Sequence, residues 1–281
     1  MDSFTRAGLT FDVVDHAPAG TAGQDAADAP TVVALHGFPQ SASVFDAVAG
    51  RLTAAGVRVL APDQRGYSPR ARPPGRRPYV VPELVADVVA LLDAAGVERA
   101  HLVGHDWGGT VAWTFAGRHP DRTLSVTSLT TPHPAAMAAA LRRPAQARRS
   151  SYMLAFQVPR LPEARLLARG GARLRRSLER AGLAPDDAQR WTTRMLEPGA
   201  LTAGLAWYRA IPLARGRGAG RTRVPTTFVT GRRDPFVAHD AAERTAGFVL
   251  GPYRHVELDA DHWLPEHRPD DVAAAVLAHL R

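Results

Sequence analysis

The stretch AHLVGHDWGGTVAW, residues 100–113, decides the fold. Apolar residues typical of a buried strand run into Gly104, Asp106 and Gly108, and a helical pattern follows. A sharp turn from strand to helix needs such small residues, because the two elements pack closely there, and it exposes its central side chain at the carboxyl end of the strand. A carboxylate that only capped the helix would explain Asp106 but not the flanking glycines. The stretch therefore predicts Asp106 as a catalytic nucleophile.

Outward from this turn, short apolar strand patterns alternate with helical patterns. The expected strands span residues 9–14, 31–35, 57–61, 100–103, 124–129, 225–230 and 253–258, and the expected helices span 43–55, 81–95 and 110–118. Alternation of this kind is typical of parallel strands joined by helices that cover both faces of a sheet. The sequence therefore predicts an α/β fold with a mostly parallel central sheet flanked by helices.

The alternation stops in residues 133–223, which are rich in Arg and Leu and have helical periodicity. This interruption predicts a core formed by residues 1–132 and 224–281, with residues 133–223 inserted as a helical lid, or cap. The expected exit from the core is PHP at 132–134, and the expected return is a flexible linker, RGRGAGRTR at 215–223.

Composition limits the classes of function. No run of 18 or more apolar residues occurs, and the start MDSFTRAGLTFDVVDHAP lacks the basic and apolar parts of a signal peptide. We therefore expect a cytoplasmic protein without a membrane partner. The chain has no Cys, which excludes disulfides and thiolate nucleophiles, and no metal-ligand spacing appears. We expect neither a metal nor a cofactor.

The formal net charge of +8 comes with 35 basic residues, all of them Arg. They cluster in residues 70–77, 142–149, 165–180 and 215–223, without a zinc-finger or RNA-recognition motif nearby. Solvated, arginine-rich faces explain this pattern, so we expect no nucleic-acid partner. A weak, salt-sensitive attraction to polyanions is the alternative interpretation.

An aspartate nucleophile restricts the reaction in a way that a serine does not. A carboxylate that attacks an alkyl carbon forms an ester, and water can then cleave this ester at the carboxyl carbon of Asp106. A serine would form an ether, which water does not readily cleave. The expected substrate therefore has an electrophilic sp³ carbon with a leaving oxygen or halide, and is not an ester or amide.

A second motif, ALHGFP at 34–39, closes another expected strand. Backbone N–H groups at the end of that strand lie where an oxyanion hole is required, and the N–H groups of Phe38 and Trp107 are the expected donors. One such donor typically contributes ~10²–10³ in rate. We interpret His36 as a structural residue that orients this turn, and not as a proton-transfer group.

Two late residues complete the expected catalytic set. Asp234, in FVTGRRDPFV, and His262, in ELDADHWLPEH, each follow an expected strand, so both should lie at the same sheet edge as Asp106. His262 is the expected base that activates water, and Asp234 is expected to orient its imidazole. Asp259 and Asp261 compete for the acid role, but they are too close in sequence to His262 to reach around its ring easily.

Taken together, these motifs resemble those of the epoxide hydrolases of the α/β-hydrolase fold, over essentially the whole chain. HGFP at 36–39 is similar to that family's HGxP segment, and PDQRGYS at 62–68 is similar to its surface-loop signature. GHDWGG at 104–109 resembles, almost letter for letter, the strand-to-helix turn that carries this family's nucleophile, called the nucleophile elbow. The resemblance implies an α/β-hydrolase fold with an inserted lid.

The resemblance also implies the reaction, in which water converts a small apolar epoxide to a vicinal diol. The implied intermediate is a covalent ester on Asp106, with His262 and Asp234 activating the water. Two lid segments, SYMLAFQVPRLPE and LAWYRA, resemble those that carry the family's two epoxide-polarising tyrosines, which assigns that role to Tyr152 and Tyr208. The lid departs from the family in being Arg-rich and short between these segments, so substrate preference is not predicted.

Two other functions fit part of the pattern. A haloalkane dehalogenase shares the aspartate nucleophile, with Trp107 helping to hold the halide, but that family has Asn at the position of Phe38. A non-catalytic ligand-binding relative would keep the pocket without turnover. Retention of Asp106, Asp234 and His262 disfavours it, and a turnover assay separates the two.

The expected walls of the substrate pocket are aromatic and imply an apolar portion of the substrate. They are Phe38, Trp107, Phe156, Trp207 and Trp263. The sequence leaves open the size and stereochemistry of the substrate and the carbon that is attacked. It also leaves the oligomeric state open, with a homodimer as one alternative.

Overall fold

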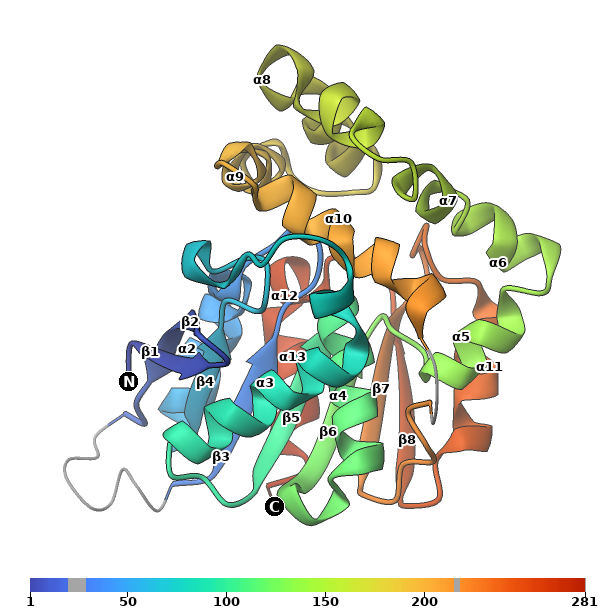
Figure 1. Ribbon diagram of the computed structural model, residues 1–281. Coiled ribbons are helices and arrows are strands. Elements are labelled where there is room, and N and C mark those ends of the chain that lie inside the picture. The colour runs from blue at the N-terminus through green and yellow to red at the C-terminus, as the bar shows by residue number, and fades with distance from the viewer. Residues whose placement is uncertain (20–28, 215–217, 281) are drawn as a thin grey trace.

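The computed structural model describes residues 1–19, 29–214 and 218–280. In these residues one sheet of eight strands has the order β1-β2-β4-β3-β5-β6-β7-β8 (Figure 1). The strands are β1 Ser3–Arg6, β2 Leu9–His16, β3 Thr31–Leu35, β4 Arg58–Pro62, β5 Ala100–His105, β6 Thr123–Leu129, β7 Thr226–Gly231 and β8 Tyr253–Leu258. Every strand predicted from the sequence is therefore present.

The sheet is parallel except at one edge. β2 runs antiparallel to both β1 and β4, and the pairs from β4 to β8 are all parallel. Every residue of β3, β5 and β7 is buried. A strand covered on both faces needs apolar or hydrogen-bonded residues at every position, which explains why these runs do not alternate in the sequence. The predicted α/β class is confirmed.

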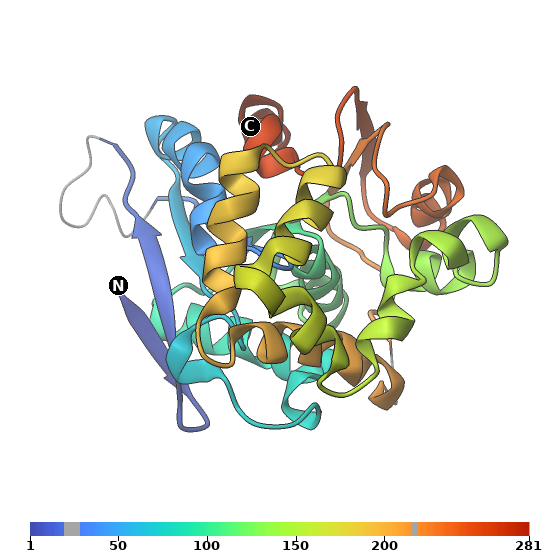
Figure 2. The ribbon, with the colours of Figure 1, turned by 90° about the horizontal axis from the view of Figure 1, so that it is seen from above.

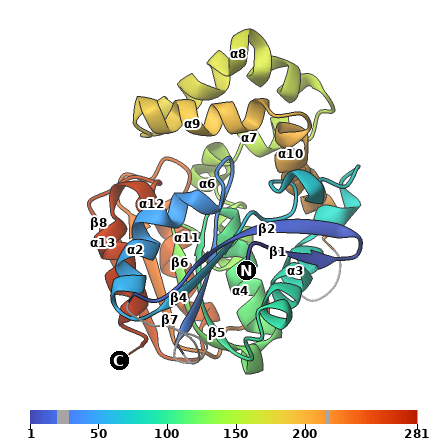
Figure 3. The same ribbon diagram turned by 90° about the vertical axis from the view of Figure 1, so that its left-hand side faces the viewer.

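Helices cover both faces of the sheet. Figure 3 shows α2 and α13 on one face and α3 and α4 on the other. The core helices are α2 Asp46–Ala54, α3 Val81–Ala94, α4 Trp107–Arg118, α11 His239–Arg244, α12 Leu264–His267 and α13 Pro269–Leu277. The 3-10 turns of the core are η1 Ala42–Phe45, η2 Pro69–Ala71, η3 Arg77–Tyr79, η4 Pro120–Arg122 and η6 Thr245–Phe248. Because the strands from β4 to β8 are parallel, their carboxyl ends all lie at one end of this three-layer core.

The regular elements that the described residues form between β6 and β7 are all helical, apart from a single bridge at Thr222. They are α5 Pro134–Ala140, α6 Pro144–Arg149, α7 Tyr152–Phe156, α8 Leu161–Arg180, α9 Pro185–Leu196, α10 Ala200–Ala210 and η5 Ile211–Leu213. Figures 1 and 2 show α8, α9 and α10 above the end of the sheet. The helical insertion predicted there is present. Its treatment as a separate unit from 133 to 223 stays a prediction, and we call this segment the lid.

Three local features differ from the sequence analysis. The strand β1 was not predicted; it forms a hairpin with β2 through Ala7 and Gly8, both at positive φ (50° and 76°). Ala is unusual in such a turn, which favours Asn-Gly, so the signal was weak. The core helices α11, α12 and α13 were not predicted either. The predicted linker 215–223 lies partly outside the described residues, and its described end is held against the core by a bridge between Thr222 and Val249.

Candidate active site

The turn after β5 has the strained geometry of a nucleophile elbow. Asp106 has φ 50° and ψ −120°, between the end of β5 and the start of α4. A Cβ on Gly108 would lie 1.9 Å from the Leu35 carbonyl oxygen, and a Cβ on Gly37 would lie 2.3 Å from Asp106 Cβ. Because neither contact is sterically possible, glycine is required at both positions. The close approach that these glycines allow places the side chain of Asp106 against the loop that follows β3.

The parallel sheet brings the predicted side chains together. Phe38 follows β3, Asp106 follows β5, Asp234 follows β7 and His262 follows β8. Each lies just beyond the carboxyl end of its strand, the edge at which α/β proteins carry their sites. The strand order therefore accounts for a cluster built from residues far apart in the chain.

His262 and Asp234 form a buried pair. His262 Nδ1 lies 2.8 Å from Asp234 Oδ2, and the two side chains are only 5% and 4% exposed. The other carboxylate oxygen, Oδ1, accepts hydrogen bonds from the backbone N–H groups of Phe236 (2.6 Å) and Val237 (3.1 Å). A carboxylate in this position holds the imidazole proton on Nδ1 and leaves Nε2 free to accept one. Nε2 lies 3.9 Å from Asp106 Oδ2.

Opposing effects set the pKa values of His262 and Asp106. Desolvation lowers the pKa of His262, but the charge and hydrogen bond of Asp234 and the charge of Asp106 outweigh it, and the net pKa is raised. Desolvation raises the pKa of Asp106, although His262 and the backbone N–H groups of Phe38 and Trp107 partly offset the rise. The carboxylates of Asp234 and Asp106 therefore favour the charged form of the imidazole, whereas its burial disfavours that form.

The two oxygens of Asp106 have different surroundings. Oδ1 accepts a hydrogen bond from the Phe38 backbone N–H at 2.9 Å, and the Trp107 N–H also bonds to the carboxylate. Oδ2 faces His262 Nε2. The side chain of Asp106 as a whole is 22% exposed. One oxygen is thus held by a backbone donor and the other lies toward the imidazole.

The lid places both predicted tyrosines against this cluster. The Tyr208 ring lies 5.1 Å from the Trp107 ring and 5.5 Å from the Phe38 ring, measured between centroids. The Tyr152 ring lies 6.0 Å from that of Tyr208. Burial raises the pKa of both phenols, and the charge of Asp106 raises them further. Both phenols therefore stay protonated and can donate hydrogen bonds.

The predicted pocket walls fall into two groups. Phe156 faces Phe38 at 6.1 Å between ring centroids, in front of the nucleophile. Trp207 is buried, with its indole N–H bonded to the Arg65 carbonyl oxygen (2.8 Å). Trp263 is also buried, and its N–H donates to the Ala181 carbonyl oxygen (2.9 Å). The two tryptophans therefore back the site and are fixed by the main chain.

Phe236 is a site residue that the sequence analysis missed. Its ring centroid lies 4.8 Å from that of His262 and 5.8 Å from that of Tyr152, so it packs between His262 and the lid. The available signal was its place two residues after Asp234, where the backbone N–H of Phe236 also bonds the carboxylate.

Among the described residues no group of three metal-ligating side chains occurs, and no helix is long and apolar enough to cross a membrane.

Comparisons with known proteins agree with this geometry. The family described as the alpha/beta hydrolase fold matches residues 30–269. Epoxide hydrolase A of Mycobacterium tuberculosis is 36% identical, with 90% of this chain and 90% of the relative covered. This chain belongs to the epoxide hydrolases of the α/β-hydrolase fold.

Other epoxide hydrolases extend the match. Epoxide hydrolase 4 of Mus musculus is 31% identical, covering 90% of this chain and 73% of the relative. The crystal structure of epoxide hydrolase A from Mycobacterium thermoresistibile aligns with a TM-score of 0.82 and 29% identity, over 99% of this chain and 97% of that chain. The similarity includes the lid as well as the sheet, because nearly the whole of both chains is aligned.

Proposed function

We propose that this protein hydrolyses small apolar epoxides to vicinal diols through a covalent ester on Asp106. The observation that carries the proposal is the surroundings of Asp106, whose Oδ2 lies 3.9 Å from His262 Nε2 and whose charge acts on the buried phenols of Tyr152 and Tyr208. The names of the relatives support the choice of epoxides as substrates. The aromatic rings of Phe38, Trp107 and Phe156, backed by Trp207 and Trp263, suit an apolar substrate.

In the first step, Asp106 Oδ2 attacks a ring carbon and the bond from that carbon to the epoxide oxygen breaks. The ring oxygen would become an alkoxide, which is too basic to form unaided at neutral pH. One phenol, of Tyr152 or Tyr208, gives it a proton while the other stabilises it by a hydrogen bond. The products are the ester on Asp106, a free hydroxyl on the substrate, and one phenolate.

In the second step, His262 Nε2 takes a proton from water, which attacks the carboxyl carbon of the ester. The negative charge that develops on Oδ1 is held by the backbone N–H groups of Phe38 and Trp107. When this intermediate collapses, the bond to Oδ2 breaks and the departing diol oxygen takes the proton from His262. The remaining water proton, on the regenerated carboxyl group of Asp106, restores the phenol.

The lid, residues 133–223, has a chemical role in this scheme. It supplies both phenols, whereas the core, residues 1–132 and 224–281, supplies the nucleophile, the base and the oxyanion donors. The scheme requires water and the epoxide, and no step requires a cofactor. The division of roles explains why a lid would be placed over this end of the sheet.

His262→Gln is expected to let Asp106 react but to slow hydrolysis of the ester, because the base acts on water and not on the first attack. Intact-mass spectrometry after mixing with styrene oxide should show an adduct of the substrate's mass, which peptide mapping places on the segment containing Asp106. Wild type under the same conditions should return to the free mass. If the variant forms no adduct where wild type turns over, the assignment of His262 as the base is wrong.

A further inference from the structure

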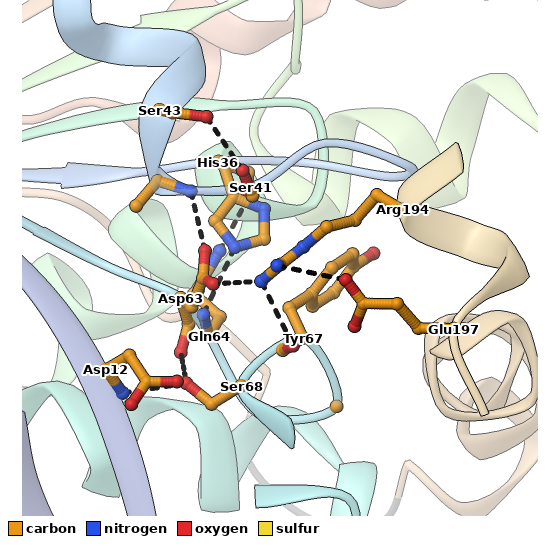
Figure 4. Close-up of polar contacts among 12 residues, drawn as sticks. Asp12, His36, Ser41, Ser43, Asp63, Gln64, Tyr67, Ser68, Arg194 and Glu197 are labelled. Atoms are coloured by element: carbon orange, nitrogen blue, oxygen red, sulfur yellow. Dashed lines mark hydrogen bonds and ion pairs between the residues drawn. The ribbon is translucent and has the colours of Figure 1, made fainter. Parts of the chain in front are cut away.

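The lid helix α9 contacts core residues that flank the loop carrying the proposed oxyanion donor. We call residues 36–42 the oxyanion loop, because they include Phe38, the proposed oxyanion donor. Figure 4 shows Arg194 of α9 reaching Asp63, which follows β4, with an ion pair between the guanidinium and Asp63 Oδ2. The same guanidinium bonds Glu197 of the lid (3.3 Å), which holds it toward the core. The Arg194 side chain is 25% exposed and that of Asp63 12%.

Asp63 and its neighbour Gln64 fix both ends of the oxyanion loop. Asp63 Oδ1 accepts the Ala42 backbone N–H (2.8 Å) at one end. At the other end, the Gln64 backbone N–H donates to His36 Nε2 (3.1 Å), and the Gln64 side-chain amide donates to the His36 carbonyl oxygen (2.5 Å). Burial lowers the pKa of His36, so the ring is neutral and can accept at Nε2. Phe38 is thus held between two anchored ends.

A second contact from α9 reaches the oxyanion loop indirectly, through Glu266 of α12. The Trp191 indole N–H donates to Glu266 Oε1 (3.2 Å), and the same oxygen accepts the side-chain amide of Gln40 (2.5 Å). Burial raises the pKa of Glu266 to about 8, so the carboxyl group is uncharged at neutral pH and tolerates this enclosed position. The amide oxygen of Gln40, Oε1, lies 2.9 Å from His105 Nδ1. His105 Nε2 in turn lies 2.9 Å from the His262 carbonyl oxygen.

We propose that α9 positions the oxyanion loop from the lid, with Arg194 as the positioning residue that acts through Asp63. The inference rests on the proposed function, because it assigns the effect to the step that uses the Phe38 N–H. A carboxylate that has lost its guanidinium partner is free to rotate toward solvent, and Ala42 would then lose its acceptor. Since a hydrogen bond weakens steeply with misalignment, a small shift of the loop reduces stabilisation of the oxyanion.

The expected effect is specific to one step. In ester formation, Asp106 Oδ2 attacks and the charge develops on the epoxide oxygen, opposite the lid phenols. In ester hydrolysis, the charge develops on Oδ1, against the Phe38 N–H. Weakening the link from Arg194 to Asp63 should therefore slow hydrolysis of the ester more than its formation. A contact that only keeps the lid closed would instead change substrate binding and ester formation.

Rapid-quench mass spectrometry with styrene oxide measures both steps, and Arg194→Gln is the variant to test. We expect ester hydrolysis to slow by ~10-fold, less than the loss of a whole oxyanion donor, with the rate of ester formation nearly unchanged. Arg194→Lys should recover part of the rate, because it restores the positive charge. Arg173→Gln, which removes a charge from an exposed position on α8, is the matched control and should behave as wild type.

Asp63→Asn tests the same link without removing the acceptor of Ala42. It should slow hydrolysis like Arg194→Gln, and the double variant should be no slower than the slower single variant, because the two residues act as one unit. Equal slowing of both steps, additive effects, or a change confined to KM would overturn the inference. Failure of the proposed function would appear differently, as a wild-type enzyme that forms no ester at all.

Discussion

Asp106→Ala is expected to reduce epoxide turnover at least ~10⁴-fold, as removal of a catalytic nucleophile does in other enzymes. Without the carboxylate no ester can form, and the neutral Ala side chain cannot deliver water to the ring carbon. The fold should survive, because burial raises the pKa of the Asp106 carboxyl group, so the charged carboxylate is a cost to the folded state. Steady-state diol formation from styrene oxide measures the loss.

Thermal unfolding serves as the control for this variant, and its midpoint should match or exceed that of wild type. Activity close to that of wild type on any epoxide would show that Asp106 is not the nucleophile. Asp106→Asn is a poorer test, since deamidation beside His262 and its water would regenerate the aspartate.

The double change Tyr152→Phe with Tyr208→Phe is expected to slow epoxide opening by ~10³-fold or more, within the range of general acid catalysis. The substitution keeps both aromatic rings and their packing against Phe38, Trp107 and Phe156. It removes only the hydroxyl groups, so the alkoxide has no proton donor. Each single variant should keep part of the rate, because the other phenol can still donate.

Ester formation, measured by mass spectrometry, should fall in parallel with turnover in the double variant. This behaviour is the reverse of that expected for His262→Gln, in which the ester forms and persists. A double variant that opens epoxides nearly as fast as wild type would remove the tyrosines from the mechanism. If wild type ignored epoxides but released halide from haloalkanes, a dehalogenase would replace the proposed function.

Much of the fold and of the site's position could be predicted because both depend on local patterns. Each candidate residue of the core follows a strand with a clear apolar run, and a parallel sheet brings such residues to one edge. The elbow around Asp106 could be predicted because close packing demands glycine at fixed offsets. The tyrosines could be placed only through resemblance, since nothing in the spacing of Tyr152 and Tyr208 indicates that their rings meet.

The remaining features depend on contacts that have no local pattern. Arg194 and Asp63 are 131 positions apart, and each looks like an ordinary surface charge in the sequence. Glu266 lies in a short helix after His262, where a solvated carboxylate is the usual expectation, yet the packing of α9 encloses its carboxyl group. The interruption of α8 at Arg169, Gly170 and Gly171 did have a signal, the adjacent glycines, which the helical periodicity of the flanking residues obscured.

The central claim, that the epoxide carbon becomes bound to Asp106, is tested most directly by a single turnover in water labelled with ¹⁸O. With the enzyme in excess over styrene oxide, the new oxygen of the first diol should come from Asp106 Oδ2, so the diol should carry no label. The label should instead appear in the peptide that contains Asp106, because water attacks the carboxyl carbon of the ester. A labelled diol together with an unlabelled Asp106 peptide would mean that water attacks the epoxide directly, and would contradict the ester mechanism.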